Sequence, residues 1–485
     1  MRCYTGSLVT MRAKRSGYLL GFVYSTALVC GLYGFMATLP ALIVVSLCAL
    51  LIASLLYFLL ASRSATIVLL FNVSIFVLLV GRAAMRYMSN IPMESDTASH
   101  TFALLLVLIS TIVINSTFLL LQSRFAKIPT KQKSSSITKD YRFRFIVGVL
   151  FILTTLFALI KNTFLFYFAA TNGYNALYLG PGIGLPPVII AIADISPIAL
   201  GLYLATMPSK VQSHIALASY TLLQIPMLMA GKRMLFIAAV MAWVSYIFLR
   251  SKTEKGDISW IGFKEKLSMI IIVPVLIVMI PVIGALRGNN ATKDPLYELL
   301  DSQGVTLDVI AFGITFADDM PKSIYGPYVT APLVDYLLTN YVARLTLGTQ
   351  EIPAQSEDSG TLGKNYADAI SYRSLSRENY LGGQGLGSSY IIESFVDFGI
   401  LGVAAMSAII GLLLLWITYR FDHGFWTTWV ICVLLLYVYQ IPRGKVMDII
   451  LPLIQFHALL IIFAIFFATR LYNGIVIERS GRNDK

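Results

Sequence analysis

Long apolar stretches constrain the fold of this chain more than any other feature. A run of about 17–25 mostly apolar residues is long enough to cross the hydrocarbon core of a bilayer as an α-helix. Of the 485 residues, 57% are hydrophobic and 13% are charged, whereas soluble proteins are about 45–50% apolar and about 25% charged. A chain of this size cannot bury that much apolar surface in water. The composition therefore excludes a soluble enzyme, a DNA-binding protein and a disordered scaffold.

The apolar stretches predict an all-α, polytopic integral membrane protein with about twelve transmembrane helices. The predicted spans are residues 17–37, 39–61, 65–82, 102–121, 145–166, 185–206, 213–230, 233–250, 267–286, 391–418, 425–440 and 449–470. Basic residues concentrate in the N-terminal arm, after the fourth and eighth spans, and in the C-terminal tail. Because Lys and Arg are enriched in cytoplasmic segments, both termini are predicted to be cytoplasmic. The net charge of +12 is attributed to these segments and not to nucleic-acid binding.

One predicted outer segment, residues 287–390, is too polar to span a membrane and too long to be a simple connector. Helix-like apolar spacing in 303–310 and 328–341 predicts a large, mostly helical extracytoplasmic loop. The chain then divides into an N-terminal membrane domain of about nine spans (1–286), this loop subdomain (287–390), and a C-terminal membrane segment of about three spans with a cytoplasmic tail (391–485).

Several basic residues lie on the predicted outer side, against the usual charge bias. Arg82 and Arg287 are predicted at the C-terminal ends of spans, where the helix dipole favours a cation. Gly231-Lys232-Arg233 and Pro442-Arg443-Gly444-Lys445 are predicted to open spans, where a cation is unfavourable unless an anion lies between it and the helix N-terminus. An extracytoplasmic phosphate or diphosphate would fit both sites, because Arg binds phosphate bidentately. Further candidate diphosphate-binding residues on the same side are Arg287, Arg373 and Arg377.

A glycine-rich loop precedes the tenth predicted span. Gly385 and Gly387 would allow close backbone approach to a ligand, and Ser388 or Ser389 is a suitable helix N-cap. A turn with ordinary capping explains the same residues. Glu393 and Asp397 follow, one helical turn apart, and ionisable groups inside a span are functional candidates by default. A polar contact between helices is the alternative for both.

Two other ionisable residues lie inside predicted spans. His457 could act as a general base or bond to a carbonyl. Asp194 could bind an ion or satisfy the backbone of a helix broken at Pro197. The four histidines share no metal-ligand spacing, no Asp-x-Asp pair is present, and no nucleotide-binding motif occurs. No metal and no cofactor is therefore expected, and a substrate of this protein would arrive already activated.

The ordered set of outer motifs resembles a known family. Gly231-Lys232-Arg233, Gln303-Gly304-Val305-Thr306, Gly385-Leu386-Gly387-Ser388-Ser389 with Glu393, and Pro442-Arg443-Gly444 together resemble the Wzy-type O-antigen (oligosaccharide repeat unit) polymerases of bacteria. The resemblance covers about residues 225–450. Arg377 and Gly387 lack the spacing of the Arg-x10-Gly pattern described for some such polymerases, so no role follows from that pattern.

The resemblance implies a GT-C-like glycosyltransferase in the bacterial inner membrane, with its active face in the periplasm. Donor and acceptor would both be oligosaccharides on undecaprenyl diphosphate, and a polysaccharide chain-length regulator is a further expected partner besides the lipid bilayer. Arg233 and Arg443 would stabilise the departing diphosphate, with Lys232 and Lys445 as weaker contributors, and Glu393 would take the acceptor proton. The reaction is expected to invert the anomeric carbon. A ligase that uses another glycan acceptor and a non-enzymatic lipid-linked oligosaccharide flippase are the alternatives.

Overall fold

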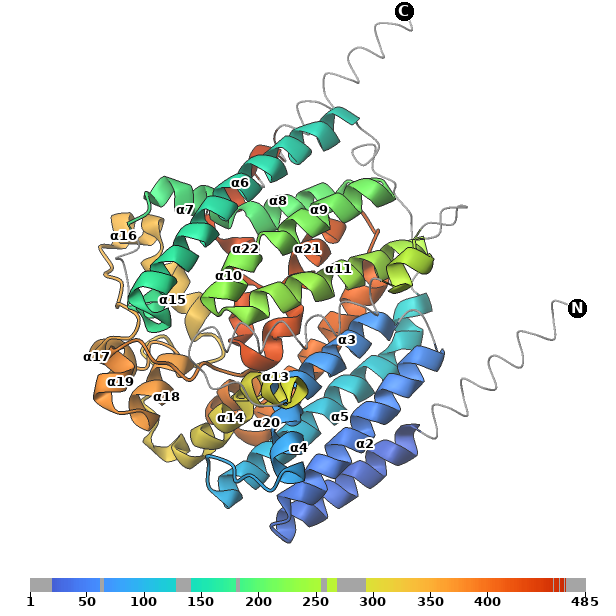
Figure 1. The fold of residues 1–485 in the computed structure, drawn as a ribbon, viewed down its shortest axis with the longest axis vertical. Coiled ribbons are helices and arrows are strands. Elements are labelled where there is room, and N and C mark those ends of the chain that lie inside the picture. The colour runs from blue at the N-terminus through green and yellow to red at the C-terminus, as the bar shows by residue number, and fades with distance from the viewer. Residues whose placement is uncertain are drawn as a thin grey trace, which may run out of the picture.

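The computed structural model describes residues 20–61, 65–127, 141–179, 184–253, 260–267, 294–456, 458–461, 463–465 and 467. Within these ranges the chain is helical, with turns between helices and no β-strand. The long helices pack side by side as a bundle, and the shorter helices from α15 (Ala331–Thr339) to α19 (Arg377–Leu381) gather at one side of it (Figure 1). The all-α expectation is confirmed for the described part of the chain.

Eight helical segments within the described ranges are long and apolar enough to cross a membrane. They are Pro40–Phe58, Thr66–Met88, Thr97–Ala126, Tyr141–Asn172, Pro187–Ala205, Arg233–Thr253, Tyr390–Arg420 and Phe425–Arg443. The helices that compose them are α2 (Pro40–Ala61), α3 (Thr66–Ile75), η2 (Phe76–Val80), α4 (Gly81–Met88), α5 (Thr97–Lys127), α6 (Tyr141–Asn172), α7 (Pro187–Asp194), α8 (Ser196–Ala205), α11 (Arg233–Thr253), α20 (Tyr390–Arg420), α21 (Phe425–Leu435) and η6 (Val438–Arg443). These segments confirm a polytopic membrane protein.

The remaining four predicted spans have different outcomes. Leu20–Met36 forms a shorter apolar helix where span 17–37 is predicted. The prediction of one helix over 213–230 is wrong, because the chain forms α9 (Lys210–Leu222) and α10 (Ile225–Ala230) there. Pro226 follows the break and cannot continue a helix hydrogen-bond ladder. Most of span 267–286 lies outside the described residues, and span 449–470 is described only up to residue 467, with gaps.

Small and hydrogen-bonding side chains hold the bundle together. Asn72 of α3 and Asn115 of α5 are buried and donate to each other's side-chain oxygens at 2.9 Å in both directions. Gly411 of α20 lies so close to α5 that a Cβ there would stand 2.9 Å from the Ile114 carbonyl oxygen. Such small and polar contacts are typical of helix packing in membranes, where apolar side chains gain little by leaving lipid.

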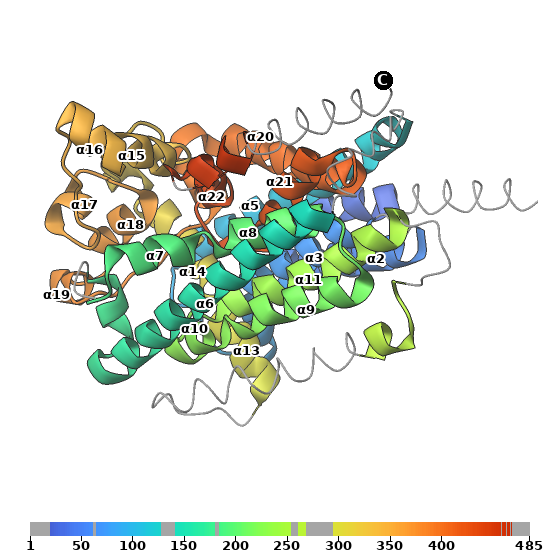
Figure 2. The same cartoon turned by 90° about the horizontal axis from the view of Figure 1, so that it is seen from above.

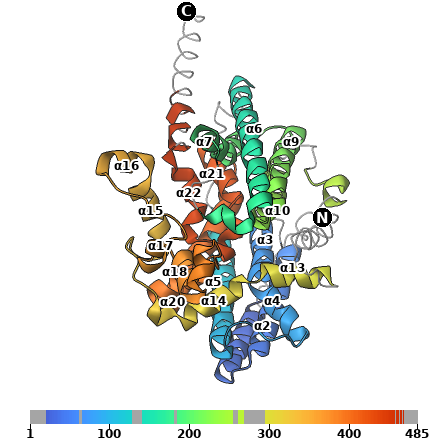
Figure 3. The ribbon, with the colours of Figure 1, turned by 60° about the vertical axis from the view of Figure 1, so that its left-hand side comes forward.

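The segment between α11 and α20 contains several short helices, joined by irregular stretches, where it is described. It contains α13 (Pro295–Gln303), α14 (Thr306–Thr315), η5 (Ala317–Asp319), α15 (Ala331–Thr339), α16 (Tyr341–Leu347), α17 (Glu357–Thr361), α18 (Tyr366–Ser374) and α19 (Arg377–Leu381). Figure 2 shows α15 to α19 at one end, whereas Figure 3 shows α13 against the helices of the bundle, beside α4. The predicted domain boundaries at 286 and 390 stay predictions.

The expected helix over 303–310 is interrupted at Gly304. A Cβ at this position would lie 2.4 Å from the Arg82 Cβ atom, so only glycine allows α13 and α14 to approach α4 this closely. The prediction that Arg82 lies at the C-terminal end of a span is wrong, because the helical segment continues to Met88.

Arg82 and Arg86 instead fasten α13 and α14 to the bundle. The Nε atom of Arg82 lies 2.8 Å from an Asp308 carboxylate oxygen. The two groups form an ion pair, but their angles do not meet the geometry of a hydrogen bond. Arg86 Nε donates to the Asp301 carboxylate at 2.7 Å, and Arg82 Nη1 donates to the Asp301 carbonyl at 2.9 Å. Arg82 and Asp308 are both buried, so this ion pair holds α14 in place from inside the protein.

Candidate active site

The turn between α10 and α11 places two basic residues at a helix N-terminus, as the sequence predicts. Gly231 caps α10 in the left-handed conformation, with φ of 107°, and the Lys232 backbone N–H donates to the Met227 carbonyl at 2.8 Å. Arg233 is the first residue of α11. Its Nη1 atom donates to the Ser302 hydroxyl at 3.1 Å, near the end of α13.

Arg443 reaches the same end of α13 from another element. It is the last residue of the 3-10 helix η6, so the prediction that it opens a helix is wrong. Pro442 and Gly444 flank it, and η7 (Val446–Ile449) begins only after Lys445. Arg443 Nη1 donates to the Gln303 side-chain oxygen at 3.1 Å and to the Gln303 carbonyl at 3.4 Å.

Buried contacts hold η6 where it presents Arg443. Tyr439 is fully buried and shares a hydrogen bond with Ser245 of α11. The Gln440 side chain donates to the Leu436 carbonyl at 3.1 Å. The short helix is therefore anchored to α11, the same helix that carries Arg233 at its start.

We call the space between these elements the cationic hollow. It has a volume of about 330 Å³ and is lined, among others, by Tyr174, Tyr178, Lys232, Arg233, Ser302, Gln303 and Arg443. No acidic residue is among the described residues that line it. The Lys232 ammonium lies 5.0 Å above the Tyr178 ring, and burial together with nearby Lys161 lowers its pKa. Three basic side chains around one space, without a carboxylate, favour binding of an anion.

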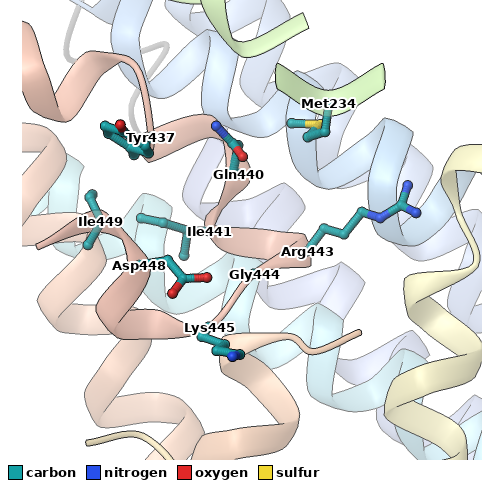
Figure 4. A pocket seen from close by; sticks show the side chains of 9 residues that line it. All are labelled: Met234, Tyr437, Gln440, Ile441, Arg443, Gly444, Lys445, Asp448 and Ile449. Atoms are coloured by element: carbon teal, nitrogen blue, oxygen red, sulfur yellow. The ribbon is translucent and has the colours of Figure 1, made fainter. Parts of the chain in front are cut away.

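Two further hollows adjoin the first. The junction hollow, about 190 Å³, shares Met234 and Arg443 with it and is also lined by Lys445 and Asp448. Figure 4 shows that the Arg443 side chain extends away from Asp448, although both residues line the junction hollow. The polar hollow, about 510 Å³, shares Lys232 and Leu235 with the cationic hollow. It shares Tyr437, Gln440 and Asp448 with the junction hollow.

Glu393 lies close to these hollows but lines none of the three. It is fully buried, and both carboxylate oxygens accept hydrogen bonds: one from the Ser388 hydroxyl at 2.7 Å, the other from the Val446 backbone N–H at 3.1 Å. These contacts join the start of α20 to η7. This geometry gives Glu393 a bracing role, and its action as the base stays a prediction.

The glycine loop is positioned by the helices around it. Ser389 is the N-cap of α20 and accepts a hydrogen bond from the Ile391 N–H at 3.4 Å, which confirms the capping prediction. Gly387 has a φ of 87°, and a Cβ on Gly385 would lie 2.9 Å from the Gln355 side-chain amide. Neither Gly385, Gly387 nor Ser388 lines the three hollows, so a role of this loop in substrate binding stays a prediction.

The other predicted site residues lie apart from the cationic hollow or outside the described chain. Arg373 of α18 and Arg377 of α19 are exposed, and Arg377 forms an ion pair with Glu357. Arg287 and His457 lie outside the described residues. No group of three or more His, Cys, Asp and Glu side chains that could hold a metal ion occurs in the described ranges.

Asp194 and Asp397 have structural partners. Asp194 ends α7 and forms an ion pair with Lys161 of α6, beside the polar hollow. Asp397 accepts hydrogen bonds from the Tyr328 and Val329 backbone N–H groups, at 2.9 and 2.8 Å, and so fixes the turn before α15.

Several residues of the hollows carry no recognisable sequence signal. Tyr174 and Tyr178 come from the short helix η4 (Tyr174–Tyr178), which follows α6. Gly383 packs against this segment so tightly that a Cβ on Gly383 would lie 2.4 Å from the Asn175 carbonyl oxygen. Asp448 had one available signal: it follows Lys445 by three residues on the same predicted outer stretch.

The comparisons with known proteins agree with the resemblance seen in the motifs. A family model described as O-antigen polysaccharide polymerase Wzy matches residues 19–474, which is nearly the whole chain. No curated protein and no solved structure matches the chain significantly. The match includes the segments that carry Lys232, Arg233 and Arg443. The chain belongs to the Wzy family of O-antigen polysaccharide polymerases.

Proposed function

We propose that this protein polymerises undecaprenyl-diphosphate-linked oligosaccharide repeat units into O-antigen or a related surface polysaccharide. The reaction takes place on the periplasmic face of the bacterial inner membrane. It is a glycosyl transfer that inverts the anomeric carbon, needs no metal, and releases a lipid diphosphate. The observation that carries the proposal is the convergence of Lys232, Arg233 and Arg443 on one hollow that no described acidic residue lines.

Arg233 and Arg443 hold the diphosphate in this proposal. Negative charge grows on the diphosphate as the glycosidic bond to it breaks, and fixed cations stabilise that charge without reorganising. The two guanidinium groups come from different elements, and the side chains of Ser302 and Gln303 hold them at the end of α13. Lys232 and Lys445 contribute as point charges beside them.

The proposed membrane arrangement has about twelve spans, a GT-C-like fold, and both termini in the cytoplasm. The loop of residues 287–390 then lies in the periplasm, where a chain-length regulator reaches it. We expect a reporter fused near residue 135 or 258 to be cytoplasmic and one near residue 355 to be periplasmic. Protease protection of residue 355 in spheroplasts would contradict both the topology and the periplasmic site.

The packing of Gly383 on η4 gives a test of the wall of the cationic hollow. Gly383→Ala should lower polymerisation several-fold, because a Cβ 2.4 Å from the Asn175 carbonyl oxygen displaces the segment that carries Tyr174 and Tyr178. Gly326→Ala is the matched control: its φ of 88° resembles the 91° of Gly383, but nothing lies within 4 Å of its Cβ position. Both variants carry the backbone strain of a positive φ, about 1–2 kcal/mol. Equal rates for the two would show that the contact with η4 is unimportant.

Purified protein supplied only with lipid-linked repeat units tests the proposed function. A polymerase produces a ladder of products that differ by one repeat unit. A ligase produces nothing until a second type of glycan acceptor is added, and a flippase forms no covalent product under either condition. A ladder supports the proposal, and either of the other results overturns it.

A further inference from the structure

The polar hollow differs chemically from the cationic hollow beside it. Lys161 and Asp194 line it, but they neutralise each other in an ion pair. Gln224, Gln440 and Gln455 offer amide groups, and Tyr220 and Tyr437 offer aromatic rings. Amides that donate and accept hydrogen bonds, together with aromatic faces, suit a neutral, hydroxyl-rich ligand better than a polyanion.

The polar hollow also has room for such a ligand. Its volume of about 510 Å³ is larger than that of the cationic hollow, about 330 Å³. The two hollows meet at Lys232 and Leu235. A sugar in the polar hollow would therefore lie next to a diphosphate-linked sugar held at Arg233 and Arg443.

Asp448 is the acidic residue best placed to act on that sugar. It lines both the junction hollow and the polar hollow. Its side chain is exposed, yet burial raises its pKa, while the Lys445 charge and backbone N–H group lower it. The two observations agree because the carboxylate faces hollows that protein atoms surround on several sides but that stay open to solvent. Figure 4 shows its oxygens directed into the junction hollow, below Gln440.

The carboxylates of Asp194 and Glu393 each have another partner within the protein. Asp194, the other acidic residue that lines the polar hollow among the described residues, is paired with Lys161. Glu393 accepts hydrogen bonds on both oxygens and lines none of the three hollows. A general base must lie within hydrogen-bond reach of the proton that it takes, and this requirement favours Asp448.

We propose that the polar hollow binds the terminal sugar of the acceptor and that the Asp448 carboxylate takes the proton of its attacking hydroxyl group. This inference rests on the proposed function. The hydroxyl oxygen forms a bond to the anomeric carbon of the donor, and the bond from that carbon to the diphosphate oxygen breaks. The electron pair of the broken bond leaves with the diphosphate, and the hydroxyl proton passes to Asp448, which later releases it to water.

The arrangement of the two charged groups fits inversion at the anomeric carbon. Inversion requires the attacking hydroxyl and the leaving diphosphate to lie on opposite faces of the donor sugar. Arg443 extends away from Asp448 in Figure 4, so a donor sugar between them would meet the acceptor on one face and release its diphosphate on the other.

The central experiment compares Asp448→Asn with Asp448→Glu in the polymerisation assay. A positioned general base contributes about 10²–10⁴-fold to a rate. We therefore expect Asp448→Asn to lower kcat at least a hundredfold, with donor binding and the thermal midpoint unchanged. Asp448→Glu, which keeps the carboxylate, should recover part of that loss. Asp358→Asn, at an exposed carboxylate on α17, is the matched control and should behave as the wild type.

The KM values for the acceptor and for the donor test the proposal that the polar hollow binds the acceptor sugar. Gln455→Ala removes an amide that lines the polar hollow but not the other two. It should raise KM for the acceptor several-fold and leave KM for the donor unchanged. An equal rise of both KM values, or no rise at all, would overturn the assignment of this hollow to the acceptor.

Other outcomes separate the two proposals. If the wild type forms a ladder and Asp448→Asn turns over normally, the inference fails while the proposed function stands. Loss of donor binding or of folding in Asp448→Asn would mean that Asp448 braces the loop next to Arg443, which also overturns the inference. A loss of kcat in Glu393→Gln but not in Asp448→Asn assigns the base to Glu393. If the wild type forms no polymer from lipid-linked units, the proposed function itself fails.

Discussion

Replacing Arg443 by alanine should lower the rate of polymerisation by about 10²–10³-fold, the usual effect of removing one group that stabilises charge in a transition state. Arg443 contacts neutral groups of Gln303 and lines both the cationic and the junction hollow. Its removal therefore takes away a cation that we assign to the departing diphosphate. The measurement is the initial rate of ladder formation with purified, folded variant at saturating lipid-linked substrate.

Two further variants make this result specific. Arg443→Lys keeps the charge but loses the planar, bidentate group, so it should recover only part of the rate. Arg344→Ala removes an arginine that is 47% exposed and paired with Glu351 at 3.2 Å, away from the three hollows, and should leave the rate unchanged. A wild-type rate for Arg443→Ala at a normal protein level would remove this residue from the site.

Replacing Arg82 by leucine should destabilise the protein by about 3–5 kcal/mol, because it leaves the buried Asp308 carboxylate without its partner. Burial already raises the pKa of Asp308 to about 6, and the charge of Arg82 is the main opposing effect. Arg86 also lowers this pKa, whereas Glu94 and Asp301 raise it. The thermal midpoint in detergent, followed by intrinsic fluorescence, would measure the loss.

The stability lost in Arg82→Leu should depend on pH, because folding raises the pKa of Asp308. A carboxyl group whose pKa is raised on folding is protonated more readily in the folded state, so stability falls as pH rises from the unfolded toward the folded pKa. Without Arg82 the folded pKa of Asp308 rises further. The difference in thermal midpoint between wild type and Arg82→Leu should therefore be larger at pH 8 than at pH 5. A difference that is independent of pH would contradict the buried-charge explanation.

The exposed ion pair between Arg344 and Glu351 is the matched comparison. Its side chains are 47% and 52% exposed, and such surface pairs contribute about 0–1 kcal/mol. Arg344→Ala should shift the midpoint little at either pH. The double variant Arg82→Leu/Asp308→Leu should regain part of the loss, because it removes the unpaired charge. If the double variant is as unstable as Arg82→Leu, packing of Arg82 and not its charge explains the effect.

The membrane helices could be predicted well from the sequence because the thickness of the bilayer sets both their length and their composition. Hydropathy does not predict the helices correctly where the chain turns within an apolar run. Residues 213–230 are mostly apolar, but the chain turns at Leu223 and Gln224 before Pro226 and forms two helices. A span count based on apolar length alone does not detect such a turn.

The candidate site could be predicted only in part. Lys232 and Arg233 follow a glycine and precede an apolar run, which is a local pattern, and the structure places Arg233 at the start of α11. Arg443 has a similar local pattern, but Pro442 and Gly444 end a 3-10 helix there and do not begin a long one. The hydrogen bond from Arg443 to Gln303 joins residues 140 positions apart, and no local pattern in a single sequence encodes such a contact.

Glu393 illustrates the same limit. A carboxylate near the outer end of an apolar helix is a reasonable catalytic candidate from sequence alone. Its hydrogen bonds to Ser388 and to the Val446 N–H group depend on how α20 packs against η7, which only the three-dimensional structure reveals. Asp448 differs from Glu393, because its position on the walls of two hollows is what makes it a catalytic candidate.

The most direct test of the account is the stoichiometry between new glycosidic bonds and released lipid diphosphate. Purified protein would be given lipid-linked repeat units labelled separately in the glycan and in the diphosphate. The account predicts one undecaprenyl diphosphate released for each repeat unit added to the ladder, with both signals falling together in Arg443→Ala. Release of lipid diphosphate without growth of the glycan, or growth of the glycan without release, would contradict it.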